Sequence, residues 1–182
     1  MSNNIIAIVG MCGSGKSVVS DALVEMGYKK VYFGGVTMEK LQEVGLEVNE
    51  KNEKMMREKL RKELGMDAYA KVLLPRIKKY FEDGNVVLDG LYSWDELKYL
   101  QDNLNKIIVI SIVTDKEIRY NRLSQREIRP LSMDDAKNRD IAEIENLAKG
   151  GPIAYADYFI FNNKGRDECK AQLFNILDNL GE

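Results

Sequence analysis

A glycine-rich loop that ends in Lys16-Ser17 constrains this chain more than any other feature of its sequence. The segment GMCGSGKS, from Gly10 to Ser17, matches the pattern G-x-x-x-x-G-K-[ST] in full. An apolar run precedes it and a helix-like segment follows, as the pattern requires. Such glycines bring backbone N–H groups close to phosphate oxygens, and the following helix points its positive end at them. The segment therefore predicts a phosphate-binding loop, and a chance glycine-rich turn is the alternative.

The polar residues of this loop have predicted chemical roles. We expect Lys16 to neutralise the charge of the β- and γ-phosphates of a nucleotide, and Ser17 to coordinate Mg²⁺. Cys12 is either a small filler or a redox-sensitive thiol near a helix N-terminus. The residues of this segment predicted to hold the nucleotide are Gly10, Cys12, Gly13, Ser14, Gly15, Lys16, Ser17 and Val18.

Five short runs rich in Ile and Val alternate with longer helical patterns. Most of them lack apolar–polar alternation, which is typical of strands buried on both faces of a parallel sheet, so the predicted class is α/β. In the helical parts, Thr114 with Glu117 and Ser93 with Glu96 fit capping boxes, and Pro75 predicts a kink or a break. The predicted strands are Asn4–Val9, Lys29–Phe33, Asn85–Asp89, Lys106–Val113 and Asp157–Phe161.

The composition excludes several classes of function. The chain has no histidine and two distant cysteines, so we expect no zinc-type site, and any acid or base must be Asp, Glu, Lys, Tyr or Cys. With 27 basic and 29 acidic residues, no broad basic face for nucleic acid or an acidic membrane is expected. No apolar run approaches the roughly 18 residues of a membrane span, and MSNN leads directly into the first run rather than into a signal peptide. We expect one cytoplasmic domain whose oligomeric state stays open.

Asp89 and a group of arginines are further candidates for phosphate chemistry. Asp89 ends a buried run, where an acid in a phosphate-loop protein holds Mg²⁺; capping of a turn is the alternative. Arginines at positions 119, 122, 126 and 129 share one face if the helix continues. A solvated charged face is the alternative, and we prefer it for Arg119. Arg122 and Arg126 lead into a predicted mobile loop, 126–135, where they would stabilise phosphoryl charge and exclude water. Arg139 follows this loop and is a further candidate for contact with the nucleotide.

Four islands carry a resemblance to a known group of enzymes. GMCGSGKSVVSDALVEMGY, VVLDGLYSWDEL, RLSQR with the following SMDDAKNRD, and ADYFIFNNKG together resemble the nucleoside monophosphate kinase superfamily, and most of all dephospho-CoA kinase and its archaeal kinase-like relatives. The resemblance covers nearly the whole chain. It implies a single three-layer domain, 1–182, with a parallel five-stranded sheet of order 2-3-1-4-5. It also implies a helical acceptor-binding insert at about 34–84 and a lid at about 122–139.

The same resemblance implies an activity and its residues. The reaction would transfer the γ-phosphoryl group of Mg·ATP to a nucleotide, nucleoside or dephospho-CoA-like acceptor. Arg122 and Arg126 match the lid arginines of the family, and the backbone from Asn162 to Gly165 would lie near the adenine. The implied catalytic residues are Lys16, Asp89, Arg122 and Arg126; Ser17 and Asp89 hold the metal; Arg122, Asn163 and Gly165 also contact the nucleotide.

The acceptor half of the chain departs from this family. After the second strand the family has an acid and then an arginine, whereas here Gly35 stands where the acid would be and Met38 stands near the arginine position. After Asp89-Gly90, where many relatives have an arginine, this chain has Leu91. Two functions therefore remain open: a small-molecule kinase with an unusual acceptor, and a nucleotide-binding regulatory NTPase or sensor without one. The candidates for contact with an acceptor are Tyr32, Thr37, Glu39 and Tyr92.

Overall fold

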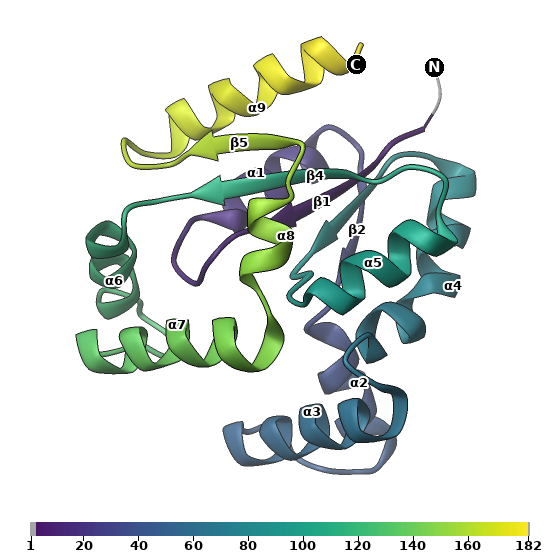
Figure 1. Ribbon diagram of the computed structural model, residues 1–182, viewed down its shortest axis with the longest axis vertical. Coiled ribbons are helices and arrows are strands. Elements are labelled where there is room, and N and C mark those ends of the chain that lie inside the picture. The colour runs from purple at the N-terminus through teal and green to yellow at the C-terminus, as the bar shows by residue number, and fades with distance from the viewer. Residues whose placement is uncertain (1–2, 182) are drawn as a thin grey trace.

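A parallel five-stranded sheet forms the centre of the computed structural model, which describes residues 3–181. The strand order is β2-β3-β1-β4-β5, as Figure 1 shows, so the predicted class and the predicted order are confirmed. Each strand lies inside one of the predicted apolar runs. The strands are β1 Ile5–Val9, β2 Lys29–Tyr32, β3 Val86–Asp89, β4 Ile108–Val113 and β5 Tyr158–Phe161.

Helices connect successive strands and cover both faces of the sheet. The two long connections lie between β2 and β3 and between β4 and β5, and each contains three helices. The helices are α1 Lys16–Glu25, α2 Gly35–Glu43, α3 Glu50–Leu64, α4 Ala68–Asp83, α5 Trp94–Asn103, α6 Lys116–Ser124, α7 Met133–Leu147, α8 Gly150–Ala154 and α9 Arg166–Leu180.

The apolar residues of β1 divide between two cores. Ile6 and Ile8 belong to a cluster that contains buried residues of α1 and α9. Ile5, Ala7 and Val9 belong to a cluster on the other face that contains residues of α4 and α5. Both faces of the strand are therefore dry, which explains why its sequence shows no polar alternation. Each fully buried isoleucine stabilises the fold by about 1.5–3 kcal/mol relative to an exposed one.

The predicted acceptor insert contains α2, α3 and α4, and Pro75 does not break it. α4 is a single helix on both sides of the proline. Leu73 and Ile77, which flank Pro75, are fully buried. Their burial offsets the backbone hydrogen bond that a proline removes from a helix.

The predicted lid contains the end of α6, the segment 125–132 and the start of α7. Because α6 ends at Ser124, Arg126 and Arg129 leave the helix, and the expected single face of arginines does not form. Figure 1 shows α6 with α7 as one projection from the sheet and α2 with α3 as another. Arg129 connects the two through an ion pair of 3.0 Å with Glu53 on α3.

One of the two predicted capping boxes is present. Ser93 and Glu96 cap α5 reciprocally, and burial raises the pKa of the Glu96 carboxyl to about 7. The box predicted for Thr114 and Glu117 is wrong, because α6 begins after Asp115 without a side-chain cap. The Thr114 hydroxyl instead donates a hydrogen bond of 3.0 Å to the carbonyl of Ser14. Thr114 is therefore tied to the phosphate loop rather than to its own helix.

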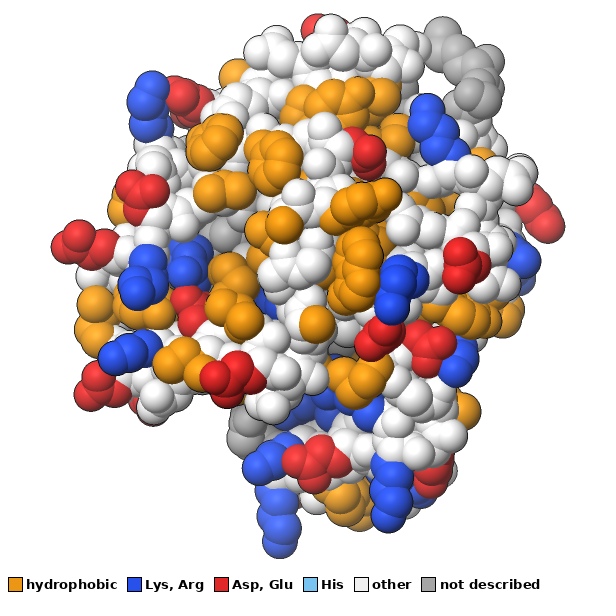
Figure 2. Space-filling view, in the orientation of Figure 1, with side chains coloured by type: hydrophobic (Ala, Val, Ile, Leu, Met, Phe, Trp, Pro, Cys, Tyr) orange, Lys and Arg blue, Asp and Glu red, His pale blue; other side chains and the backbone are white. Residues whose placement is uncertain are grey.

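The surface is mixed in charge, as the balanced composition implies. Figure 2 shows acidic and basic side chains interspersed on the face toward the viewer, with apolar side chains among them. Within residues 3–181, no helix is both long enough and apolar enough to cross a bilayer.

Candidate nucleotide-binding site

The phosphate loop lies between the end of β1 and the start of α1, and two of its glycines are required by close neighbours. Gly13 has φ +80°, and a Cβ there would lie 2.8 Å from the carbonyl oxygen of Arg119. Gly15 has φ +95°, and a Cβ there would lie 2.1 Å from the side-chain nitrogen of Asn162. Both the backbone conformation and the space exclude other residues. The loop is thus held between α6 and the end of β5.

A cavity of about 690 Å³ opens over this loop and brings together most of the predicted residues. Asp89, Arg122, Arg126 and Gly165 reach it from three other parts of the chain. The contributions of the loop itself are Cys12, Gly13, Gly15, Lys16, Ser17 and Val18.

Three predicted residues do not line the cavity. Gly10 accepts a hydrogen bond from Lys16 through its carbonyl, 2.9 Å away. Ser14 is fully buried. The side chain of Asn163 accepts a hydrogen bond of 3.0 Å from the backbone of Asp115.

Lys16 is held over the loop by two backbone carbonyls. Its amine donates to the carbonyls of Gly10 and Met11, at 2.9 and 3.0 Å. Burial, and then the nearby charge of Lys149, lower the pKa of the Lys16 amine to about 8. A phosphate at this position would supply the negative charge that the amine lacks.

Asp89 is already compensated by a cation. One of its oxygens, Oδ2, lies 2.9 Å from the Lys30 amine and accepts a hydrogen bond of 3.2 Å from Ser20. The carboxylate is 14% exposed, and Ser17 in the same cavity is exposed. The second carboxylate oxygen of Asp89 and the Ser17 hydroxyl are oxygen ligands of the kind that Mg²⁺ prefers.

Arg119 is buried, so its interpretation as part of a solvated charged face is wrong. It is 6% exposed. Its guanidinium donates to both carboxylate oxygens of Asp140 on α7, at 3.0 and 2.7 Å, and to the carbonyl of Cys12, at 3.0 Å. This pair is a structural link from α7 to the phosphate loop. Nothing in the sequence identifies it, because the two partners lie 21 positions apart in different helices.

Cys12 is a packing residue in this arrangement. Its side chain belongs to a small apolar cluster with Tyr120, Leu123 and Ala136, and the residue is 8% exposed. Of the two alternatives, its burial favours the small filler.

Arg122 reaches the cavity with part of its hydrogen-bonding capacity unused. Its Nη2 donates to the carbonyl of Asn162, 2.8 Å away. Among residues 3–181, its buried Nη1, the Ser14 hydroxyl and the Asn162 side-chain oxygen have no hydrogen-bond partner. Each such group costs about 1–3 kcal/mol when it stays unpaired. Their concentration beside one loop fits a site that a polar ligand completes.

Four further residues line the cavity, and one of them, Arg139, was a candidate for contact with the nucleotide. Arg166 directly follows Gly165, which the family resemblance places near the nucleotide. Its position in the sequence could therefore have identified it. Arg139 comes from α7. Tyr32 is the last residue of β2, and Tyr92 lies shortly after β3. The two tyrosines were candidates for acceptor contact, and both line the cavity.

The other two acceptor candidates are engaged elsewhere. Thr37 is buried, and its hydroxyl lies 2.7 Å from that of Tyr69. Glu39 accepts two hydrogen bonds of 2.9 Å from Arg76.

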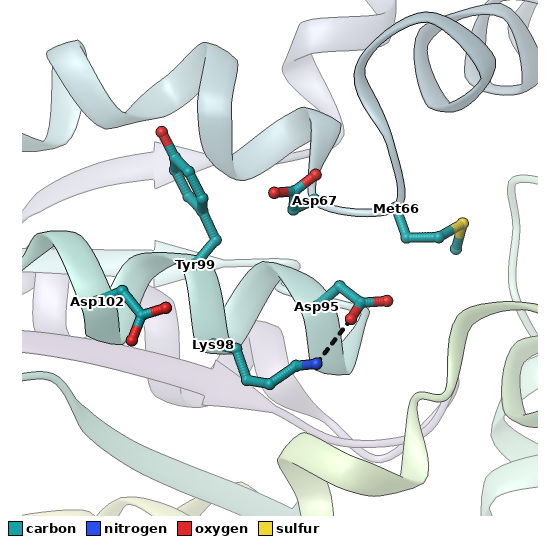
Figure 3. A pocket seen from close by; sticks show the side chains of 6 residues that line it. All are labelled: Met66, Asp67, Asp95, Lys98, Tyr99 and Asp102. Carbon is teal, nitrogen blue, oxygen red and sulfur yellow. Dashed lines mark ion pairs between the residues drawn. The ribbon is translucent and has the colours of Figure 1, made fainter.

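A second hollow, of about 410 Å³, lies between the start of α4 and the exposed side of α5. Figure 3 shows its three carboxylates spread along the groove rather than converging. Asp95 pairs with Lys98 at 2.9 Å, and Asp67 pairs with Lys71 at 2.8 Å. In residues 3–181 there is no group of three His, Cys, Asp or Glu side chains that could hold a metal ion. The cavity over the phosphate loop is therefore the candidate site.

The chain is similar in sequence and in fold to several known proteins. A family model described as "AAA domain" matches residues 6–145. A UPF0200 protein of Thermococcus kodakarensis is 31% identical over 97% of both chains. Among solved structures, a shikimate kinase from Bacteroides thetaiotaomicron matches with a TM-score of 0.62 at 12% identity. The match covers 98% of this chain and 99% of the shikimate kinase chain. A dephospho-CoA kinase from Campylobacter jejuni has a TM-score of 0.56 at 18% identity, with 98% of each chain covered. At these identities the two structures show a shared kinase-type fold.

Proposed function

We propose that this chain, which belongs to the AAA-domain family and to the UPF0200 proteins, is a Mg²⁺-dependent kinase. It would transfer the γ-phosphoryl group of ATP to a small acceptor, in the range from nucleotides and nucleosides to dephospho-CoA-like molecules. One observation carries the proposal. Lys16, Asp89 and the lid residues Arg122 and Arg126 line the same cavity, although they come from three separate segments.

The donor half of the site has the groups that phosphoryl transfer needs. Such transfer depends on positioning and on charge stabilisation more than on covalent chemistry by the protein. Backbone N–H groups of the loop and the start of α1 would bind the phosphates. The Lys16 amine would leave its two carbonyl partners for phosphate oxygens, and Arg122 would use its unpartnered Nη1.

Ser17 and Asp89 are the residues that would hold Mg²⁺. The metal, when bound, neutralises charge on the phosphate oxygens. The Lys30 and Ser20 contacts occupy only Oδ2 of Asp89, so Oδ1 is the oxygen of this residue that remains available to a metal site. Asp89→Asn should raise the Mg²⁺ concentration needed for half-maximal activity, and an unchanged Mg²⁺ dependence would exclude Asp89 from this role.

The lid would exclude water during transfer. Arg126 lies in the exposed segment between α6 and α7 and still lines the cavity. An arginine in a closing segment stabilises charge on the transferred group, and closure favours an acceptor over water.

The direct test is acceptor-dependent release of ADP, followed with a coupled assay over a panel of nucleosides, nucleotides and dephospho-CoA. Lys16→Ala should abolish turnover while the melting temperature without nucleotide stays close to that of the wild type. Absence of acceptor-dependent ADP release across the whole panel would contradict the kinase.

A regulatory NTPase or sensor is the second candidate, and one observation favours it. Among residues 3–181, Asp89 is the one carboxylate that lines the cavity, and it is paired with Lys30. No uncommitted base is therefore available for an acceptor hydroxyl. Tight ATP binding with slow hydrolysis and no response to any acceptor would support this candidate instead.

A further inference from the structure

A buried lysine lies behind the wall of the cavity that faces the phosphate loop. Lys149 is 2% exposed and pairs with Glu143, 2.5 Å away. Its amine also lies 4.7 Å from the centre of the Tyr92 ring. Ala148, just before it, has φ +49°, which is uncommon for a residue other than glycine. Burial of a charged lysine and a left-handed alanine are both unfavourable, so the surrounding contacts must hold this arrangement firmly.

This buried pair supports two residues of the cavity. The Glu143 oxygen that Lys149 does not contact accepts a hydrogen bond of 3.1 Å from Nε of Arg139. Arg139 and Tyr92 both line the cavity. Because Nε is the atom that Glu143 holds, the outer nitrogens of the Arg139 guanidinium stay available for a ligand. The Arg139 side chain is 48% exposed.

Cationic side chains outnumber carboxylates in the cavity. Its lining includes five cationic side chains against the single carboxylate of Asp89, which Lys30 already compensates. Lys149 adds a further positive charge close enough to lower the pKa of Lys16. The cationic lining residues are Lys16, Arg122, Arg126, Arg139 and Arg166.

The acceptor side lacks a base but has an arginine. A hydroxyl acceptor must lose a proton, and no uncommitted carboxylate lines the cavity among the described residues. A phosphate monoester is already ionised at neutral pH and needs no base. Arginine binds phosphate through two parallel N–H donors.

We propose that the acceptor presents a phosphate group as its nucleophile, that Arg139 and Tyr92 bind this phosphate, and that the buried Lys149–Glu143 pair positions both residues. The inference rests on the kinase function proposed above and narrows its acceptor. In the reaction an oxygen of the acceptor phosphate forms a bond to the γ-phosphorus. The bond from that phosphorus to the bridging oxygen breaks, and its electron pair leaves on the β-phosphate of ADP. No proton has to move.

The test separates the acceptor side from the donor side. The protein is first saturated with Mg²⁺ and a non-hydrolysable ATP analogue, and inorganic phosphate is then titrated at constant ionic strength by calorimetry. The wild type should bind phosphate saturably. Arg139→Gln should lower the ratio of phosphate affinity to analogue affinity at least about tenfold, because a charge-assisted contact is lost. Lys137→Gln, which removes a charge from an exposed position on the same helix, should leave the ratio unchanged.

The role of the buried pair needs a variant that folds. Lys149→Met alone leaves Glu143 without its closest partner, so the double variant Glu143→Leu/Lys149→Met removes both charges and also the oxygen that holds Arg139. It should melt cooperatively and still show a severalfold lower phosphate-to-analogue ratio, because Arg139 is no longer oriented.

Several results would overturn the inference. Failure of the analogue-bound wild type to bind phosphate saturably contradicts it. So does a wild-type ratio of phosphate affinity to analogue affinity in Arg139→Gln or in the double variant. Acetate that binds as tightly as phosphate contradicts it as well. If the analogue binds and phosphate does not, only this inference fails. If the analogue itself does not bind, the proposed kinase function fails, and the inference fails with it.

Discussion

Nucleotide binding should be coupled to proton uptake at Lys16. In the free protein, burial and the charge of Lys149 lower the pKa of this amine to about 8, while the thiol of Cys12 and the carboxylates of Glu143 and Asp89 act in the opposite direction. A bound phosphate places negative charge beside the amine and raises its pKa again. The free protein therefore loses a proton as the pH rises through 8, and nucleotide binding recovers it.

The size of the effect follows from this pKa. A group with a pKa near 8 is neutral in about 10% of molecules at pH 7, about 50% at pH 8 and about 90% at pH 9. Binding should then take up about 0.1, 0.5 and 0.9 protons at these pH values. Above pH 8 the affinity should fall by nearly tenfold per pH unit.

Calorimetry measures this uptake directly. The non-hydrolysable ATP analogue is titrated in excess Mg²⁺ in pairs of buffers with different ionisation enthalpies, and the dependence of the observed heat on that enthalpy counts the protons. Lys16→Arg is the matched control, because a guanidinium stays charged throughout. Proton uptake that does not grow between pH 7 and 9, or equal uptake in the variant, would refute the reasoning.

Three further predictions concern stability. The pKa of Glu96, about 7 in the folded chain against an ordinary 4.5, means that the native state binds this proton more tightly than the unfolded state. Urea denaturation should thus show stability falling by up to about 3 kcal/mol from pH 4.5 to 7, and Glu96→Gln should remove most of that slope; an unchanged slope would contradict it. Arg119→Met leaves Asp140 buried without its ion pair and should cost about 3–5 kcal/mol in the same assay. Arg119→Met/Asp140→Leu should cost less, and an equal loss would refute the pairing. Gly13→Ala combines φ +80° with a Cβ 2.8 Å from a carbonyl, so it should cost about 1–3 kcal/mol and weaken analogue binding; wild-type values for both would exclude this geometry.

The fold was largely predictable because its signals are local. Most strands are apolar runs without alternation, and the position of the phosphate loop follows from eight consecutive residues. The errors arose where side chains reach across the fold. Thr114 fits a capping box by spacing, yet its hydroxyl binds the carbonyl of Ser14, 100 positions away. Arg119 has acidic neighbours in sequence, yet its partner is Asp140 on another helix.

The sequence alone determined the phosphate loop of the candidate site. Its glycines, Lys16 and Ser17 lie within eight consecutive residues, so this one segment determines both their chemistry and their geometry. Only the tertiary structure decided what surrounds that loop. Asn162 lies against Gly15 across 147 positions, and Lys149 lies behind Tyr92 because α7 ends in a left-handed turn. Such contacts depend on how the helices pack on the sheet. Close packing of the core determines which side chains from distant parts of the sequence are buried next to each other.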